Sequence, residues 1–262
     1  MADDPRVDDD DEMEPETMTQ ADTTADRSHP GGGDVDGGTA LEALGVAKSY
    51  GNHAALEPLD LVVEAGELVM LVGPNGSGKT TFLRMASGLL EPTSGEVVVE
   101  GFPAGSLEAR AALSYLPDNP VLYDDLSLAE HLHYIGRLHG VDGDDVEFRG
   151  AALMERFGLT GRADDLPVTF SRGLRQKTSL ALGLIRPFSL LLVDEPFVGL
   201  DQPGKRALLE LLVDAHSQGA TVVVATHSLD FVEVAHRCIA LRDGELAYDG
   251  PATIADVERM VS

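Results

Sequence analysis

The chain has 262 residues, with 45 aspartates and glutamates against 19 lysines and arginines, and a formal net charge of −26 at pH 7. No basic stripe is visible, which argues against a general nucleic-acid binder, and the single cysteine excludes an intrachain disulfide or a cysteine-based zinc cluster. No apolar run reaches the length of a membrane span, and the acidic N-terminus lacks the positive region of a signal peptide. We therefore expect an intracellular protein that is soluble or peripheral on a membrane.

The first 40 residues differ in composition from the rest of the chain. Residues 1–40 hold 13 acids and two bases with almost no apolar side chains. Such a segment cannot bury enough apolar surface to offset the entropy lost on folding. We expect a disordered, solvated acidic tail at 1–40 and one ordered domain at 41–262.

The ordered part is itself acidic and poor in lysine. Residues 41–262 hold 32 acids and 17 bases, and the whole chain has only four lysines. A surface of this kind suits concentrated salt, because screening removes the repulsion between like charges. A salt-adapted protein is our first interpretation, and an ordinary acidic cytosolic protein is the alternative.

Apolar runs, turn residues and helical periodicity divide the ordered part into strands and helices. Strands are expected at 41–46, 61–63, 68–72, 95–100, 113–116, 189–193, 220–225, 237–241 and 245–248. Helices are expected at 80–88, from the capping box at 127–130 to about 139, and at 151–157, 204–217, 229–235 and 251–261. Turns are expected at 140–145 and 243–244, with a hairpin turn at 66–67. The segment from about 118 to 184 is expected to be a helical insert between strands.

Three histidines, His131, His133 and His139, fall on this helical insert. Spacings of two and six residues do not align them on one face of a helix. We interpret them as surface histidines rather than as a metal site. Cys238 lies in an apolar stretch and is expected in the core rather than at a reactive site.

Residues 73–80 read GPNGSGKT, which fits the phosphate-binding loop pattern G-x-x-x-x-G-K-[ST]. An expected strand precedes the loop and an expected helix follows it, which is the context that separates this motif from a chance glycine-rich turn. The glycines let backbone N–H groups turn inward on phosphate oxygens. Lys79 can reach the β- and γ-phosphates, and the Thr80 hydroxyl can ligate Mg²⁺. The expected nucleotide-binding residues here are Gly73, Pro74, Asn75, Gly76, Ser77, Gly78, Lys79, Thr80 and Thr81.

Polar side chains end two further buried strands. Asp194 and Glu195 follow the strand 189–193, and His227 follows 220–225. In a doubly wound sheet ligands bind at the carboxyl ends of the strands, so these groups are expected to converge on one nucleotide. Asp194 suits Mg²⁺, and Glu195 can accept a proton from an attacking water. A salt bridge for Glu195 and an ordinary hydrogen bond for His227 are the alternatives.

Tyr50 follows the first expected strand. On spacing alone it can stack on an adenine ring or pack in the core, and both interpretations stand at this point.

Taken together, residues 41–249 resemble the ATP-binding cassette family. The motifs that carry the resemblance fall in order: Tyr50 at the place of the adenine-stacking aromatic, the phosphate loop at 73–80, the Mg²⁺ strand and its glutamate at 190–195, the interface loop Gly199-Leu200-Asp201, and His227 at the place of the switch histidine. The resemblance implies an α/β fold. Its parts are a P-loop NTPase core with a mixed sheet, an antiparallel β edge subdomain and a helical signature subdomain.

Two segments depart from the family pattern. Residues 170–174 read FSRGL where the family signature is usually L-S-G-G-Q; Ser171 and Gly173 are kept, whereas Arg172 and Leu174 differ. The resemblance implies that Ser171 and Gly173 contact the ATP held by a second copy. Asp118 stands where the family has a glutamine that contacts Mg²⁺ and the attacking water, so we count Asp118 with Thr80 and Asp194 as a metal ligand.

The resemblance implies the ATP-hydrolysing subunit of an ABC transporter, with ATP and Mg²⁺ as cofactors and Lys79, Glu195 and His227 as catalytic residues. It also implies a head-to-tail dimer, as a homodimer or with a paired ATPase subunit, whose closure on ATP powers separate membrane-spanning permease subunits. The place of action would be the cytoplasmic face of the cell membrane, and residues 115–127 and 170–177 resemble the exporter-type branch. The alternatives are a soluble ABC-type ATPase in macromolecular assembly, repair or translation, and a metabolic kinase, against which the signature and His227 speak.

Overall fold

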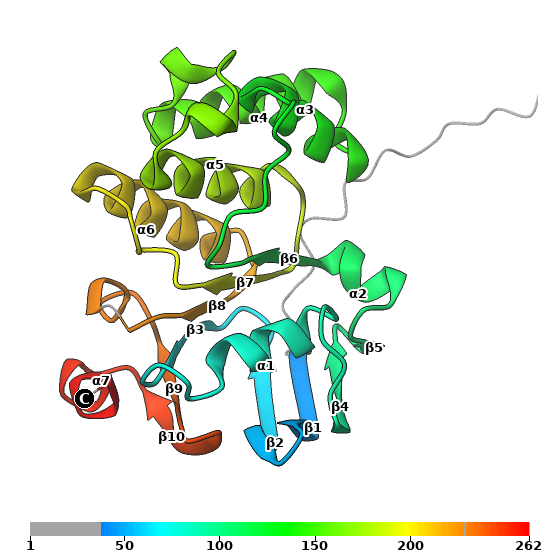
Figure 1. Cartoon of the computed structure of the whole chain (residues 1–262), viewed down its shortest axis with the longest axis vertical. Coiled ribbons are helices and arrows are strands. Elements are labelled where there is room, and N and C mark those ends of the chain that lie inside the picture. The colour runs from blue at the N-terminus through cyan, green and yellow to red at the C-terminus, as the bar shows by residue number, and fades with distance from the viewer. Residues whose placement is uncertain (1–37, 228, 262) are drawn as a thin grey trace, which may run out of the picture. The chain divides into compact units, whose positions relative to one another are not determined.

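The computed structural model describes residues 38–227 and 229–261 (Figure 1). The expected acidic tail therefore lies, up to residue 37, outside the described residues. The strands are β1 Thr39–Tyr50, β2 His53–Glu64, β3 Leu68–Val72, β4 Ser94–Val99, β5 Phe102–Pro103, β6 Leu113–Leu116, β7 Leu190–Asp194, β8 Thr221–Ala225, β9 Arg237–Arg242 and β10 Glu245–Pro251. The α-helices are α1 Lys79–Ala86, α2 Leu107–Ala112, α3 Leu128–Leu138, α4 Gly143–Arg156, α5 Arg172–Ile185, α6 Gln202–Ser217 and α7 Ile254–Val261. Short 3-10 helices cover Thr160–Arg162, Pro167–Thr169 and Leu229–Phe231.

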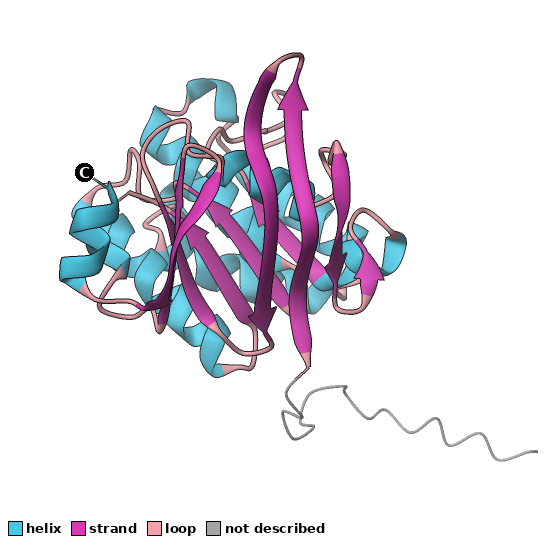
Figure 2. Cartoon of the chain, turned by 90° about the horizontal axis from the view of Figure 1, so that it is seen from below, coloured by secondary structure: helices cyan, strands magenta, loops and turns pink. Residues whose placement is uncertain are grey.

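The strands form two sheets. The smaller is antiparallel, in the order β2-β1-β4-β5, and the larger has the order β10-β9-β3-β8-β7-β6. In the larger sheet β9, β3, β8, β7 and β6 run parallel and β10 pairs antiparallel with β9, so that sheet is mixed. The fold class expected from the resemblance is confirmed, because an antiparallel edge sheet, a mixed sheet and a group of helices are all present. Figure 2 shows the long β1–β2 pair in front of the slanted strands of the larger sheet.

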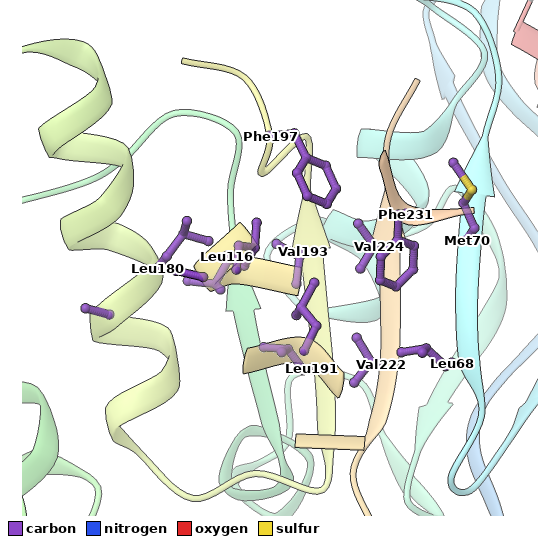
Figure 3. Packing of buried hydrophobic residues seen from close by; sticks show 14 of the residues in the cluster. Leu68, Met70, Leu116, Leu180, Leu191, Val193, Phe197, Val222, Val224 and Phe231 are labelled. Carbon is purple, nitrogen blue, oxygen red and sulfur yellow. The ribbon is translucent and has the colours of Figure 1, made fainter. Parts of the chain in front are cut away.

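The central strands are apolar except for Asp194 at the end of β7 and Thr221 at the start of β8, because both faces of the larger sheet are covered. Every residue of β3, β7 and β8 is buried. Alternate residues point to opposite faces, so Leu68 and Met70 join one core cluster while Val69 and Leu71 join the other. Figure 3 shows the first cluster, in which side chains from β3, β8 and β7 form a continuous row that reaches Leu180 of α5.

The helices α3, α4 and α5 pack on one another and, as Figure 1 shows, gather on the β6–β7 side of the larger sheet. α3 begins at the expected capping box: Ser127 Oγ accepts the Glu130 N–H, and the Glu130 carboxylate accepts the Ser127 N–H at 2.8 Å. No helix in the part of the chain that is described combines the length and apolarity needed to cross a membrane.

The structure corrects several expected element boundaries. α4 already begins at Gly143, inside the expected turn at 140–145, because Asp144 and Asp145 stand in a first turn where the helix dipole favours acids. The short helix α2, capped by Ser106, was not expected at all. The expected helix at 229–235 is only a 3-10 turn.

The residues around Gly66 do turn, but they do not close a hairpin. β2 pairs along its length with β1, whereas β3 belongs to the other sheet. The turn at 66–67 therefore joins two sheets. The expected strands at 41–46 and 61–63 are longer in the structure because β1 and β2 pair with each other up to Tyr50 and His53.

The surface interpretation of His131 is wrong, because this side chain is only 1% exposed. Its Nδ1 lies 2.8 Å from the Ser127 carbonyl oxygen, and its Nε2 accepts the Tyr123 N–H at 2.9 Å. A loop that folds back over α3 covers the ring, and helical spacing alone carries no information about such a loop.

Candidate functional site

The phosphate loop lies between the end of β3 and the start of α1, and its glycines are sterically required. Gly73, Gly76 and Gly78 all have positive φ, where side chains are strained. A Cβ at Gly73 would collide with the Leu241 carbonyl oxygen, and one at Gly78 would fall 2.9 Å from the Ala55 carbonyl oxygen. No side chain caps α1, so the first-turn N–H groups remain available to an anion.

Lys79 is the first residue of α1 and is almost fully buried. Its Nζ donates to the Gly73 carbonyl at 2.7 Å and to the Pro74 carbonyl at 3.3 Å, and lies 4.0 Å from Glu195 Oε1. Burial lowers the pKa of Lys79, and the negative charges of Glu195 and Asp194 oppose that shift. The ammonium is thus held by neutral carbonyl oxygens of the loop, and a charged phosphate can compete with them for it.

Asp194 ends β7 and is buried. Neither of its carboxylate oxygens has a hydrogen-bond partner of good geometry among the described residues. Burial raises the pKa of Asp194, and the negative charges of Asp118 and Glu195 raise it further. The nearby Thr80 hydroxyl and Lys79 lower it. A buried, unpartnered carboxylate beside a hydroxyl and a second acid is the oxygen donor set that suits Mg²⁺.

Glu195 follows Asp194 in the left-handed region, with φ +47°, which is unusual for a residue with a side chain. Its N–H donates to the Ala225 carbonyl at 2.8 Å, which fixes the turn at the ends of β7 and β8. Its Oε2 lies 2.9 Å from His227 Nδ1, while Oε1 faces Lys79. Strain held in place by neighbouring strands is typical of functional positions.

These groups surround one cavity of about 320 Å³. It is lined by His53, Ala55, Asn75, Gly76, Ser77, Gly78, Lys79, Thr80, Thr81, Asp118 and Glu195. The structure therefore brings together most of the expected nucleotide residues, including Asp118, with Asp194 and His227 in contact with lining residues. The sequence analysis missed His53 and Ala55; the signal that would have found them is the Gly51-Asn52 turn, which returns β2 toward the phosphate loop.

Besides Gly73, Pro74, Asp194 and His227, three expected site residues do not line this cavity. Tyr50 is 55% exposed, which excludes core packing, and its ring lies 5.4 Å from Lys48 Nζ. Ser171 caps α5, and its Oγ accepts the Leu174 N–H at 3.4 Å. Gly173 stands against the Gly199 carbonyl oxygen. Adenine stacking by Tyr50 and nucleotide contacts by Ser171 and Gly173 remain predictions.

The site combines three features on a mixed sheet: the buried Asp194 carboxylate, which suits Mg²⁺, the glycine-rich phosphate loop, and Glu195 with its positive φ. These features define a phosphate-loop ATPase. Residues 56–198 match the family model described as ABC transporter. The chain is 37% identical to the SkfA peptide export ATP-binding protein SkfE of Bacillus subtilis over 80% of this chain and 88% of that protein. It is 34% identical to a putative ABC transporter ATP-binding protein of Halobacterium salinarum over 82% of this chain and 94% of that protein.

Two solved structures are similar in fold. An ATP-binding subunit of an ABC transporter has a TM-score of 0.77 and 32% identity over 84% of this chain and 92% of that one. The post-hydrolysis dimer of the ATP-binding cassette MJ0796, bound to ADP and Pi, has a TM-score of 0.75 and 26% identity. The match covers 81% of this chain and 99% of that one. The chain therefore belongs to the ABC transporter family, as an ATP-hydrolysing nucleotide-binding subunit.

Proposed function

We propose that this chain binds ATP with Mg²⁺ in the 320 Å³ cavity and hydrolyses it with Glu195 as the base, as one half of a dimer that drives membrane-spanning export subunits. The observation that carries the proposal is the meeting of Lys79, Glu195 and His227, through contacts of 4.0 and 2.9 Å, beside the unpartnered Asp194.

The phosphate loop would hold the β- and γ-phosphates through backbone N–H groups and through Lys79. The Lys79 ammonium would exchange its contacts with the Gly73 and Pro74 carbonyls for phosphate oxygens, which are stronger acceptors because they are charged. The pKa of Lys79 is lowered by burial, and a negative phosphate would favour its charged form.

Thr80 and Asp194 would hold the metal ion together with Asp118, which also lines the cavity. A Mg²⁺ ion bound there would neutralise charge on the phosphate oxygens. Burial and, after it, the negative charges of Asp118 and Glu195 raise the pKa of Asp194, so a divalent cation would relieve a repulsion already built into the fold.

Glu195 would take the proton from the attacking water. His227 sits at Oε2 and leaves Oε1, which faces Lys79, as the oxygen that receives the proton. The role of His227 is then to hold the carboxylate in one orientation.

The dimer is supported by two observations. The solved relative MJ0796 is dimeric, and Ser171 and Gly173 lie away from the cavity of their own chain. In a two-fold, head-to-tail dimer these residues would reach the ATP held by the other copy, with the N-terminus of α5 directed at phosphate.

Export is the finer part of the proposal. Relatives named as export ATP-binding proteins support it, among them SkfE and the Nod factor export ATP-binding protein I of Cupriavidus metallidurans, 34% identical. Work at a membrane requires partner subunits that span it, and the chain would act from the cytoplasmic face, on the periphery of the membrane.

The test is co-purification of tagged Glu195→Gln protein with ATP and Mg²⁺, solubilised in detergent from its own membranes. Loss of the base should stop turnover and leave ATP binding intact, so the closed dimer accumulates with its partners. Near-stoichiometric recovery of an integral-membrane protein is the expected result. Lys79→Ala is the matched control, since it should bind no nucleotide and recover no closed dimer.

Two other outcomes would each overturn a part of the proposal. A soluble dimer with a ribosomal or repair partner would overturn export and favour the soluble ABC-type ATPase. Turnover retained in Glu195→Gln would remove Glu195 as the base.

A further inference from the structure

A loop of ten residues, 117–126, leaves the nucleotide cavity and ends at α3. Asp118, near its beginning, lines the cavity. Tyr123, five residues later, lies against His131 in the second turn of α3, with ring centroids 5.8 Å apart. The loop thus spans from the cavity to the group of helices that carries the signature.

His131 is the buried group that fixes the far end of this loop. Its Nε2 accepts the Tyr123 N–H at 2.9 Å, and its Nδ1 lies 2.8 Å from the Ser127 carbonyl oxygen. The Tyr123 N–H can only donate and the Ser127 carbonyl can only accept. The geometry therefore assigns the neutral ring with its proton on Nδ1, the one state that satisfies both contacts.

The start of α3, where His131 lies, is itself held by hydrogen bonds. The first turn of α3 is closed by the Ser127–Glu130 capping box. The Leu128 N–H donates to the Asp165 carbonyl at 3.1 Å, and the Ala129 N–H donates to the Ala163 carbonyl at 2.9 Å. The same end of α3 is thereby joined to the segment that leads into the signature at 170–174. Tyr123 also meets Tyr134 of the same helix edge-on at 5.7 Å, which is a second contact between the loop and α3.

We propose that His131 is a positioning residue for ATP hydrolysis: it fastens Tyr123 to α3 and so sets where Asp118 stands in the nucleotide cavity. The proposal rests on the proposed role of Asp118 as a metal ligand. A loop that is held at Tyr123 by this part-buried hydrogen bond keeps its carboxylate in one place, and misplacement of a reacting group by about 1 Å can cost on the order of 100-fold in rate.

Three substitutions separate the hydrogen bond from packing. Glutamine can place an oxygen near the position of Nε2 and accept the Tyr123 N–H, asparagine reaches only as far as Nδ1, and leucine keeps bulk without any acceptor. Turnover with Mg²⁺ and ATP should fall about tenfold or more in His131→Leu and His131→Asn, and stay within about twofold in His131→Gln. Binding of a fluorescent ATP analogue without Mg²⁺ should change less than about twofold in all three.

The melting temperature of each variant excludes a purely structural role. Turnover that tracks melting temperature across the series, or a Gln variant as slow as Leu, would overturn the proposal. If leucine prevents folding, the Asn and Gln pair still decides the matter, because both are polar and differ only in reach.

A double-mutant cycle with Asp118→Asn identifies the route of the effect. If His131 acts through Asp118, the loss caused by Asp118→Asn should largely disappear in the His131→Leu background. Additive losses, or no effect of Asp118→Asn alone, would overturn this route. Failure of nucleotide binding in the unaltered chain would instead count against the proposed function, which Lys79→Ala tests separately.

Discussion

At the scale of one residue, Asp194 lowers the stability of the fold while it offers carboxylate oxygens that suit a cation. Its carboxylate is buried at the end of β7 without a hydrogen-bond partner of good geometry in the described part of the chain. A buried polar group without a partner costs free energy of folding, and the pKa of Asp194 is raised chiefly by burial. The folded chain thus carries a charge that Thr80 and Lys79 favour only in part, and that a bound cation would favour further.

We predict that Asp194→Asn raises the melting temperature of the nucleotide-free chain at pH 7 while abolishing Mg²⁺-dependent turnover. Because the folded pKa of Asp194 lies above the unfolded value, the native carboxyl binds its proton more tightly, and stability falls as pH rises through the folded pKa. Removing about 1 kcal/mol of this cost corresponds to roughly 2–4 °C. The gain should vanish in acid, below the ordinary pKa of an aspartate.

Melting curves from acid to neutral pH, without divalent cations, measure this difference. Asp201→Asn is a control of opposite sign, because a hydrogen bond from Lys177 lowers the pKa of Asp201, so its contribution is present at neutral pH and lost as pH falls. Parallel pH profiles for Asp194→Asn and the unaltered chain would contradict the prediction.

Sequence reasoning predicted which residues meet better than it predicted their conformation. The phosphate loop, Asp194 and Glu195 follow from residue types that end buried strands, and the structure places them around one cavity. The positive φ of Glu195 and the approach of His53 depend on how β2 and β8 lie next to the loop, which no local pattern records. His131 was misjudged for the same reason, since a distant loop decides its burial.

At the scale of the element, short buried strands are the features that sequence predicts best. The expected strands at 68–72 and 113–116 coincide with β3 and β6, because a continuous apolar run bounded by turns leaves few alternatives. The sequence analysis missed α2, which begins with capping by Ser106, and the start of α4, which has acids in its first turn. Both signals also occur in ordinary turns.

The start of α5 packs so tightly on the loop after Glu195 that we predict a stability loss of about 1–2 kcal/mol for Gly173→Ala. A Cβ at Gly173 would fall 2.7 Å from the Gly199 carbonyl oxygen, and that backbone must move. Gly143→Ala is the matched control in the first turn of α4, where nothing lies within 4 Å of the added Cβ. Alanine favours helix there, so the control should be neutral or slightly stabilising.

Urea unfolding without nucleotide isolates packing from any contact with ATP. A shift of the midpoint in Gly173→Ala, with an unchanged slope and no loss in Gly143→Ala, is the expected result. Equal midpoints for the two variants would mean that the loop around Gly199 yields freely, and that α5 is not held against it.

At the scale of the whole molecule, the dominant feature is negative charge. Residues 41–262 carry 32 acids against 17 bases. Ion pairs between the described residues use few of these acids, with Arg156 and Arg237 each held by two carboxylates. Many exposed carboxylates therefore repel one another, and salt relieves that repulsion over distances beyond about 10 Å at 0.1 M.

We predict that the melting temperature rises steeply between dilute buffer and molar KCl. Glu57, Glu96 and Glu245 are exposed and form no ion pair among the described residues, so replacing all three by lysine should raise stability in dilute buffer and flatten the salt dependence. Sucrose at matched osmolality is the control for preferential exclusion, which strengthens apolar burial without screening charge. Greater stability in dilute buffer than in KCl would refute salt adaptation, and an equal rise in the triple variant would assign the effect to burial rather than to charge.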